Sequence, residues 1–512
     1  MPIHDRDLRK AIRGIVALVA MAGMLTMFGC SGGGDGAESS RAATAGDLEN
    51  QVLTFSDGAV FAAALANTEV RLTFSDFDTD GDGNPNTGPF TLASVATGEA
   101  TGTGTIGSCN LAVAESTFDP ETFPELQPEQ TIPLDPCEVN TDDGSLSVQN
   151  ATTGATAISG PPSPIPTNNV AFILTEGGGT GSYSVVDLQS RDLFADITLG
   201  GVHSDAVPAR VFDGRIYVVN RLGVDSIQII DPQQGYTTPP GAELSVGNGA
   251  NPHDIAFVSA DKAYVSRFGA AELFIINPTT LTQVGEIDLS SLVKLDDLDG
   301  LPEMDRMIMH NGLLYLTLEH LDTTAFFTPL TAGEVVVIDP ATDTIVRVIQ
   351  LNARNPFSSL QFSPALNRIL VSTVGNFGVA DGGIEAINPE TNTVDPGFIL
   401  DEATTGGEIT HFEVVSATQG FAVFGAFVDG MFLNTLVSFN PSTGELGDPL
   451  LGPLDTFLPH FAINSRNELY LAVNDDETPT PGVRVFDIIQ EVELDQVLSG
   501  ALPPVFVVFI EE

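Results

Sequence analysis

The chain of 512 residues contains 51 Gly and 33 Pro, no Trp, 42% hydrophobic and only 17% charged residues. Asp and Glu number 68 against 19 Lys and Arg, which gives a formal net charge of −49 at pH 7. The apolar fraction is sufficient for a packed core and excludes a wholly disordered chain. The acidity excludes nucleic acid as a partner, because such a surface repels phosphates. It favours solubility and cation binding and also fits a saline habitat, and composition does not separate these.

Residues 1–29 are expected to form a signal peptide. A basic segment precedes an apolar run at 15–28, and about 14 apolar residues are too few to span a bilayer. The run ends at Gly29-Cys30, followed by the Gly-rich stretch 31–36, so 30–44 is predicted to be a flexible tether. The basic residues are Arg6, Arg9, Lys10 and Arg13.

This segment resembles a bacterial lipoprotein signal. The resemblance implies that Cys30 is lipidated and becomes the mature N-terminus, and Ser31 implies sorting to the outer membrane. The expected location is an outer-membrane or cell-surface lipoprotein that faces the periplasm or the exterior and touches the membrane only through its lipid. The alternative is ordinary secretion with cleavage nearby.

Residues 45–168 are rich in Thr, Gly and Ala, with alternating apolar positions such as 70–74, and end in a Pro-rich linker at 161–166. They are expected to form a small β-rich or irregular domain. Two of the three cysteines, Cys109 and Cys137, lie here, and an oxidising compartment would join them in a disulfide. Two buried free thiols are the alternative. The sequence has no CxxC or CxxCH motif, so a thiol-redox site and a c-type haem are not expected.

The segment 76–84 alternates aspartates and ends in glycines, a spacing that wraps around a hard cation such as Ca²⁺. The closing Glu of an EF-hand is missing, so the choice is between a simpler calcium loop and an acidic, solvated turn. A GxGxxG match at 102–107 lacks a following helix, and no nucleotide is expected there. The candidate calcium ligands are Asp76, Asp78, Asp80 and Asp82.

A repeat organises residues 169–512. An apolar strand that ends in Asp or Asn, usually followed by Pro, recurs seven times at intervals of 44 to 62 residues. In each unit a second strand precedes it, a third precedes that, and a more polar fourth strand follows. The repeated residues are Asp187, Asp231, Asn277, Asp339, Asn388, Asn440 and Asp487.

Seven units of four short strands predict an all-β fold, a seven-bladed β-propeller. The first unit lacks an innermost strand, whereas the last is followed by an unused apolar strand at 503–510. The C-terminal strand is therefore predicted to complete the first blade, so that no sheet edge stays open.

The strands Tyr217–Asn220 and 229–232 resemble the YVTN-type β-propeller repeat of exported bacterial proteins. The resemblance covers about two-thirds of the chain. It implies the propeller fold and little about function, because such propellers include surface-layer proteins and binding modules, and related folds include lactonases and a copper enzyme.

Few residues carry recognisable chemistry. In a propeller, the starts of the innermost strands gather around the mouth of the central channel. His253, His411 and His460 occupy such positions, and Arg210 and Arg267 are expected near them. This rim would bind a metal or an anionic ligand, with His411 and His460 the closer pair. The alternative is that these residues only form hydrogen-bonded turns.

Two functions follow from this reading. The first is an exported, lipid-anchored propeller that acts as a binding or scaffold module and takes a protein, glycan or small ligand on its upper face. The second is a lactonase-like or metal-assisted enzyme that uses the His/Arg rim. No complete catalytic constellation is present in the sequence, which favours the first.

Overall fold

The structure is a computed structural model, and its strands form two compact units. The first unit comprises Met1–Pro166 and the short segment Phe194–Leu199, and the second comprises Thr167–Leu193 and Gly200–Glu512. The residues that the structure describes are 40–42, 51–55, 61–62, 70–74, 87–94, 98–105, 110–116, 120, 122–140, 146–153, 156–158, 165–177, 179–195, 197, 201–325, 327–474, 482–498 and 502–511. Within these residues, no helix combines the length and the apolarity needed to cross a bilayer.

The first unit contains two antiparallel sheets. The larger one follows the chain order β2 (Gln51–Phe55), β3 (Val70–Phe74), β4 (Thr87–Ser94), β5 (Gly98–Thr105), β6 (Leu111–Ser116) and β7 (Thr131–Ile132). The smaller one has the order β1 (Ser40–Ala42), β8 (Leu134–Asn140), β9 (Leu146–Asn150) and β10 (Thr156–Ile158). Since β1 pairs with β8, the last part of the predicted tether is a strand. Buried side chains such as Leu72 and Val148 form one core.

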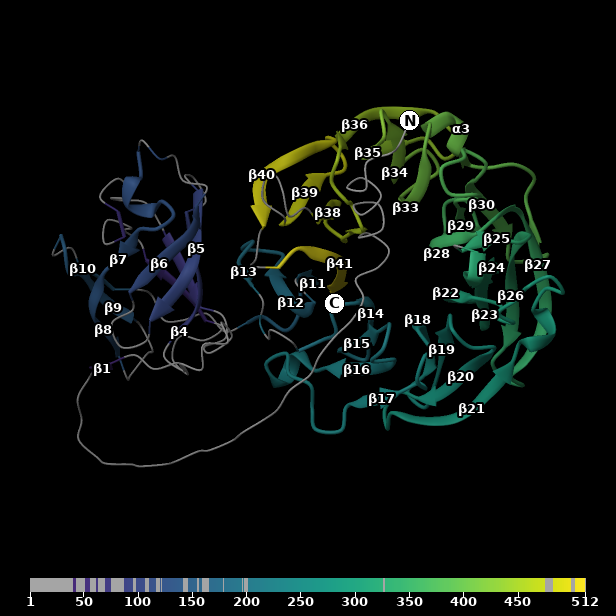
Figure 1. Cartoon of the computed structure of the whole chain (residues 1–512), viewed down its shortest axis with the longest axis horizontal. Helices are drawn as coiled ribbons and strands as arrows, with labels where there is room; N and C mark the ends of the chain where they lie inside the picture. Colours follow the sequence, from purple (N-terminus) through teal and green to yellow (C-terminus); the bar gives the residue numbers. More distant parts are fainter. Residues whose placement is uncertain are drawn as a thin grey trace. The chain divides into compact units, whose positions relative to one another are not determined.

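The second unit is a seven-bladed β-propeller, as predicted, and Figure 1 shows its sheets arranged around a central axis. Each blade is given from its innermost strand outward. Blade 1 is β41 (Pro504–Ile510), β11 (Val170–Gly177), β12 (Thr180–Asp187) and β13 (Leu193–Phe194). Blade 2 is β14 (Ala206–Phe212), β15 (Arg215–Asn220), β16 (Ser226–Ile230) and β17 (Glu243–Ser245). Blade 3 is β18 (Pro252–Ser259), β19 (Lys262–Arg267), β20 (Glu272–Asn277) and β21 (Thr282–Asp288).

The remaining blades follow the same order. Blade 4 is β22 (Met304–His310), β23 (Leu313–Leu318), β26 (Ala332–Asp339) and β27 (Thr344–Arg354), with the inserted hairpin β24 (Leu321–Asp322) and β25 (Thr328–Pro329). Blade 5 is β28 (Pro356–Ser363), β29 (Arg368–Thr373), β30 (Gly383–Asn388) and β31 (Thr393–Val394), and β32 (Leu400–Asp401) also pairs with β30. Blade 6 is β33 (Glu408–Val414), β34 (Gly420–Val428), β35 (Met431–Phe439) and β36 (Leu446–Leu454). Blade 7 is β37 (Phe461–Ile463), β38 (Glu468–Val473), β39 (Gly482–Asp487) and β40 (Val492–Leu498).

The C-terminal strand closes the ring, which confirms the prediction. Strand β41 pairs antiparallel with β11, with Val170 opposite Ile510 and Phe172 opposite Val508. Figure 1 shows the C-terminus beside blade 1 near the axis. The N-terminal and C-terminal ends of the repeat region therefore share one sheet, and β41 covers the inner edge of β11 that would otherwise be unpaired.

The repeated Asp or Asn builds the turn between the third and fourth strands. In all seven blades its side-chain oxygen accepts a hydrogen bond from the backbone N–H two residues later, as in Asp231 to Gln233 (3.0 Å) and Asn277 to Thr279 (3.0 Å). Asp and Asn suit this position because their short side chains reach their own backbone. The formation of this turn therefore explains why Asp or Asn recurs at this position in each unit.

Apolar packing joins the blades to one another. Buried clusters combine residues of successive blades, for example Tyr217 and Val219 of blade 2 with Val265 of blade 3. The tyrosine of the second strand also reaches forward, since the Tyr315 hydroxyl donates to Asn392 Oδ1 of the next blade at 2.9 Å. The sheets are thus fixed against each other, and the polar residues of the channel mouth sit on a rigid frame.

Candidate functional site

The upper face of the propeller is the end at which the innermost strands begin and the second strands finish. In blades 3 and 4 three polar side chains meet at this end. His253 is the second residue of β18, Asp305 is the second residue of β22, and Glu319 directly follows β23. Both innermost strands have an irregular register at this point, between Pro252 and Asp254 and between Met304 and Met307. Such bulges change the direction of side chains at the ends of strands.

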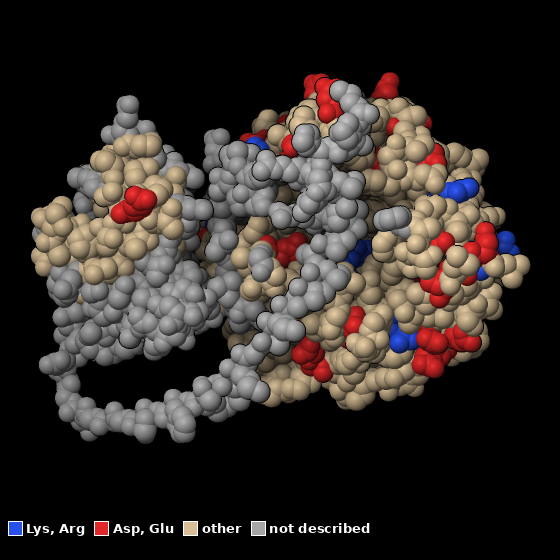
Figure 2. Space-filling model, viewed as in Figure 1, with Lys and Arg blue, Asp and Glu red and all other residues tan. Residues whose placement is uncertain are grey.

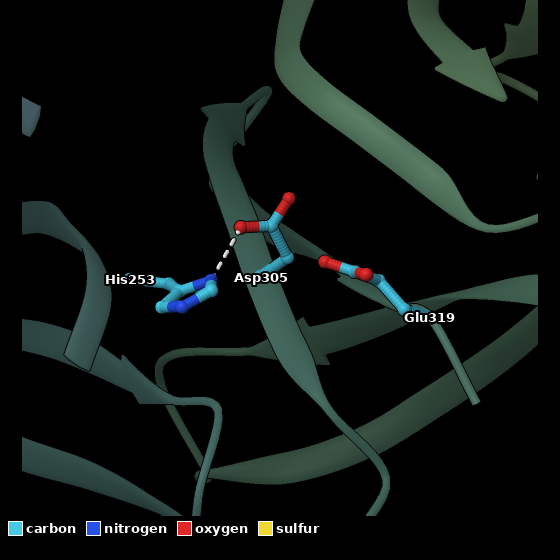
Figure 3. Close-up of side chains that lie close together, drawn as sticks. All are labelled: His253, Asp305 and Glu319. Atoms are coloured by element: carbon cyan, nitrogen blue, oxygen red, sulfur yellow. Dashed lines mark hydrogen bonds and ion pairs between the residues drawn. The ribbon is translucent and has the colours of Figure 1, made fainter. Parts of the chain in front are cut away.

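The three side chains form a compact group. One ligand atom from each of His253, Asp305 and Glu319 lies within 4.8 Å of the other two. Figure 3 shows the side chains pointing toward one another, with the His253 ring facing the Asp305 carboxylate across the gap between two blades. His253 Nδ1 lies 2.9 Å from Asp305 Oδ1. One imidazole and two carboxylates are a ligand set that suits a divalent transition metal.

Burial controls the protonation of this group. Asp305 and Glu319 are 3% and 5% exposed. Burial lowers the pKa of His253, and the hydrogen bond to Asp305 opposes this only in part, so the ring is neutral and keeps a lone pair. Burial first, and then the charges of Asp305 and Glu303, raise the pKa of Glu319 well above its usual range. The charges of Arg306 and Arg221 lower the pKa of Glu319 only in part, and a neutral imidazole beside this buried acidic group favours a bound cation over a bound anion.

Glu319 is the residue of the group without a fixed partner. Its carboxylate makes no hydrogen bond or ion pair with another residue of the described part of the chain, although it is 95% buried. Only its backbone N–H is engaged, by the carbonyl of Glu303 at 3.1 Å. A buried carboxylate without a partner is costly, and a cation or a proton removes that cost.

The arginines around the mouth are already neutralised. Arg210 binds Asp254 through Nε and Nη2 at 2.9 and 3.0 Å, Arg221 binds Asp205, and Arg306 Nε lies 3.3 Å from Asp305 Oδ1. Among the described residues no Lys, Arg or His forms an ion pair with Glu319, although the charges of Arg306 and Arg221 act on its carboxyl group from a distance. Figure 2 shows the same imbalance more widely, with acidic side chains spread over the visible described surface and few basic ones among them. The mouth therefore favours a cation over an anionic ligand.

His411 and His460 lie together, and their rings are 4.4 Å apart between centroids, which confirms the predicted proximity. His411 Nε2 lies 2.8 Å from the carbonyl of Phe461, so it carries the proton, and the Ser358 hydroxyl lies 3.3 Å from Nδ1. His460 Nδ1 accepts from the Val507 N–H at 3.4 Å. These bonds occupy both nitrogens of His411, so the two rings join blades 5, 6, 7 and 1.

The two predicted arginines differ in their surroundings. Arg210 lies in β14 and faces the mouth, where Asp254 holds it. Arg267 ends β19 and turns into blade 3: it donates to the carbonyls of Glu272 (2.9 Å) and Val246 (3.2 Å), and its guanidinium lies 3.6 Å from the Phe274 ring centroid. Arg267 is 7% exposed, so its donors are engaged in holding adjacent strands and loops.

The other predicted site residues belong to the N-terminal region. Cys30, Asp76, Asp78, Asp80, Asp82 and Cys109 lie outside the residues that the structure describes, and so does the predicted signal peptide. Cys137 is described and buried, in β8. The lipid anchor, the calcium loop and the Cys109–Cys137 disulfide remain predictions.

The sequence interpretation missed Asp305 and Glu319. Asp305 stands at the same place in blade 4 as His253 in blade 3, one residue into the innermost strand, and an alignment of strand starts would have revealed it. Glu319 follows the second strand at the place of Arg221 in blade 2, but a polar residue there is too common to stand out. Only the three-dimensional closeness of adjacent blades identifies it.

Comparison with known proteins finds similarity among solved structures only. No protein-family model matches the chain, and a search of curated proteins finds no match. Among solved structures it is similar to the dihydro-heme d1 dehydrogenase NirN (14% identity, TM-score 0.46, 68% of this chain and 76% of that one). It is also similar to apo AztD from Citrobacter koseri (13%, 0.41, 66% and 97%) and to a streptogramin B lyase (10%, 0.39, 60% and 92%). At these identities the similarity concerns the fold alone.

Proposed function

We propose that this protein is an exported, lipid-anchored β-propeller that binds a divalent transition-metal ion at the mouth of its channel. His253, Asp305 and Glu319 are the ligands. The observation that carries the proposal is their convergence within 4.8 Å on the upper face, where Glu319 has no other described partner. Since β18 and β22 hold His253 and Asp305, and Glu319 directly follows β23, binding a metal orders little of the chain.

The ligand set determines the class of metal. Nitrogen from imidazole suits Zn²⁺, Cu²⁺, Fe²⁺ and Ni²⁺, whereas carboxylate oxygen alone suits Mg²⁺ and Ca²⁺. Zinc accepts this mixture of ligands at about 2.0–2.2 Å from nitrogen and oxygen. We therefore take Zn²⁺ as the probe. The acidic surface also favours a positively charged ligand, because it raises the local concentration of cations.

Calorimetric titration of the full chain with Zn²⁺ tests the proposal. The parent protein should bind zinc with its strongest step at this site, and His253→Ala and Glu319→Gln should weaken that step at least tenfold. His310→Gln is the matched control, because it removes a histidine at the opposite end of β22. Unchanged binding in both site variants, or no binding in the parent, would reject the proposal.

A metal-assisted hydrolase is the second candidate. Three protein ligands leave a coordination position open for water or substrate, which is the arrangement of catalytic rather than structural zinc sites. A panel of lactones, assayed with and without chelator, tests this activity. Turnover that requires the metal and is lost in Glu319→Gln would favour the enzyme over the binding module.

A further inference from the structure

A second group of carboxylates lies in the connection from blade 3 to blade 4. The segment between β21 and β22 carries Asp297, Asp299 and Glu303, and one carboxylate oxygen of each lies within 4.8 Å of the other two. The position is distinct from the transition-metal site, although Glu303 precedes Met304 and Asp305 in the chain. None of the three carboxylates pairs with a Lys, Arg or His among the described residues.

Glu303 supplies an independent observation. Its side chain is 0% exposed, and Oε1 has no hydrogen-bond partner in the described structure, whereas Oε2 accepts from the Leu321 N–H at 2.9 Å. A fully buried carboxylate oxygen without a donor is rare in folded proteins and costs free energy. Here its closest polar neighbours include two more carboxylates, so the missing partner has to be a cation or a proton.

Backbone hydrogen bonds hold the carboxylates of Asp297 and Asp299 in place. Asp299 Oδ1 accepts from the Leu301 N–H at 3.1 Å, and Oδ2 accepts from the Thr323 N–H at 2.9 Å. Asp297 Oδ1 accepts from the Asp299 N–H at 3.2 Å, while its Oδ2 is buried without a donor. Asp297 and Glu303 thus each have one buried carboxylate oxygen without a donor, and each contributes an oxygen to the group whose atoms lie within 4.8 Å of one another.

From this geometry we propose that Asp297, Asp299 and Glu303 bind a Ca²⁺ ion. All the donors are oxygen, which suits a hard cation, and Ca²⁺ tolerates irregular arrangements of six to eight oxygens more readily than Mg²⁺ does. An ion here joins the connection between blades 3 and 4 to the start of blade 4. The Glu303 carbonyl is already held there, because it accepts the N–H of Glu319 at 3.1 Å. Calcium therefore stabilises the segment that carries Asp305.

Calcium titration of the full chain tests the proposal, with zinc left out. The parent should bind one more Ca²⁺ than Asp299→Asn and Glu303→Gln, and saturating Ca²⁺ should raise the melting temperature of the parent but not of these variants, by about 5 °C at 100 times Kd. Asp296→Asn is the matched control, because it removes one exposed charge from the same segment and should leave binding unchanged. Asp297→Asn is the milder variant, should the other two unfold.

Two results would overturn the proposal. Equal calcium stoichiometry in the parent and in folded Asp299→Asn would place all calcium elsewhere, for example at Asp76–Asp82. No calcium-dependent shift in the parent at 10 mM Ca²⁺ (an amount about ten times the weakest extracellular affinities) would mean that a proton holds the three carboxylates together. Since zinc takes no part, this experiment and the zinc titration fail independently.

Discussion

Asp254 and Arg210 join the innermost strands of blades 3 and 2 through two parallel hydrogen bonds of 2.9 and 3.0 Å. The same carboxylate accepts the N–H of Met307 in blade 4 at 3.0 Å. Similar contacts recur around the channel, where Gln361 Oε1 accepts from the Val414 N–H at 2.7 Å. Backbone ladders end at the edge of each blade, so these side chains supply the polar link from one innermost strand to the next.

Replacing Asp254 by Ala should therefore destabilise the propeller strongly. The carboxylate is 0% exposed, and its loss leaves both a partly buried guanidinium and the Met307 N–H without their acceptor. Removing one partner of a buried pair costs about 3–5 kcal/mol. Urea denaturation followed by circular dichroism measures this change. Asp261→Ala, at an exposed turn, should stay within about 0.5 kcal/mol, and an equal loss in the two variants would contradict the prediction.

Removing the C-terminal strand should open the ring. A chain that ends at Gly500 lacks β41, whose Val505, Phe506, Val507 and Ile510 are buried in blade 1. At about 1.5–3 kcal/mol for each buried apolar side chain, the loss is on the order of 6–12 kcal/mol and approaches the whole stability of a domain. Thermal melting should show a transition far below that of the full chain, or none. A truncated protein that melts like the full one would show that β41 does not stabilise the ring.

The period and the closure could be predicted from sequence because they depend on local chemistry. Asp231 and Asn277 form the same turn in their own blades, and an Asp or Asn does so in each of the other units. The apolar pattern of the strands repeats at the same interval. The site could not be predicted in this way. Asp305 and Glu319 come close only because two strands of blade 4 and the neighbouring β18 are packed together. The role of Arg267 likewise depends on Phe274 and Val246, which no spacing rule connects with it.

The lipid anchor remains a prediction from the sequence. If Cys30 carries the lipid, Cys30→Ser should abolish incorporation of labelled fatty acid and move the protein from the detergent phase to the aqueous phase, or leave an uncleaved precursor. Cys137→Ser is the control, because it lies in β8 and should keep the label. Unchanged partitioning of Cys30→Ser would favour ordinary secretion.

His411 should make the stability of the propeller depend on pH. The ring is 4% exposed, and burial lowers its pKa to about 4, although the hydrogen bond to the Phe461 carbonyl opposes the shift. In the unfolded chain a histidine has a pKa of about 6.5. Between these values the unfolded chain binds a proton that the folded chain does not, so folding becomes less favourable as the pH falls from about 6.5 toward 4.

The size and the sign of this effect can be measured with His411→Gln, which cannot titrate and still offers a donor to Phe461. A shift from 6.5 to about 4 corresponds to about 3 kcal/mol of stability, present above pH 6.5 and lost by about pH 4. Urea denaturation at intervals from pH 7.5 to 4 should show the parent losing that amount relative to the variant, while above pH 7 the difference between them stays constant. Parallel curves across the whole range would mean that His411 takes up its proton in the folded protein as readily as in the unfolded chain.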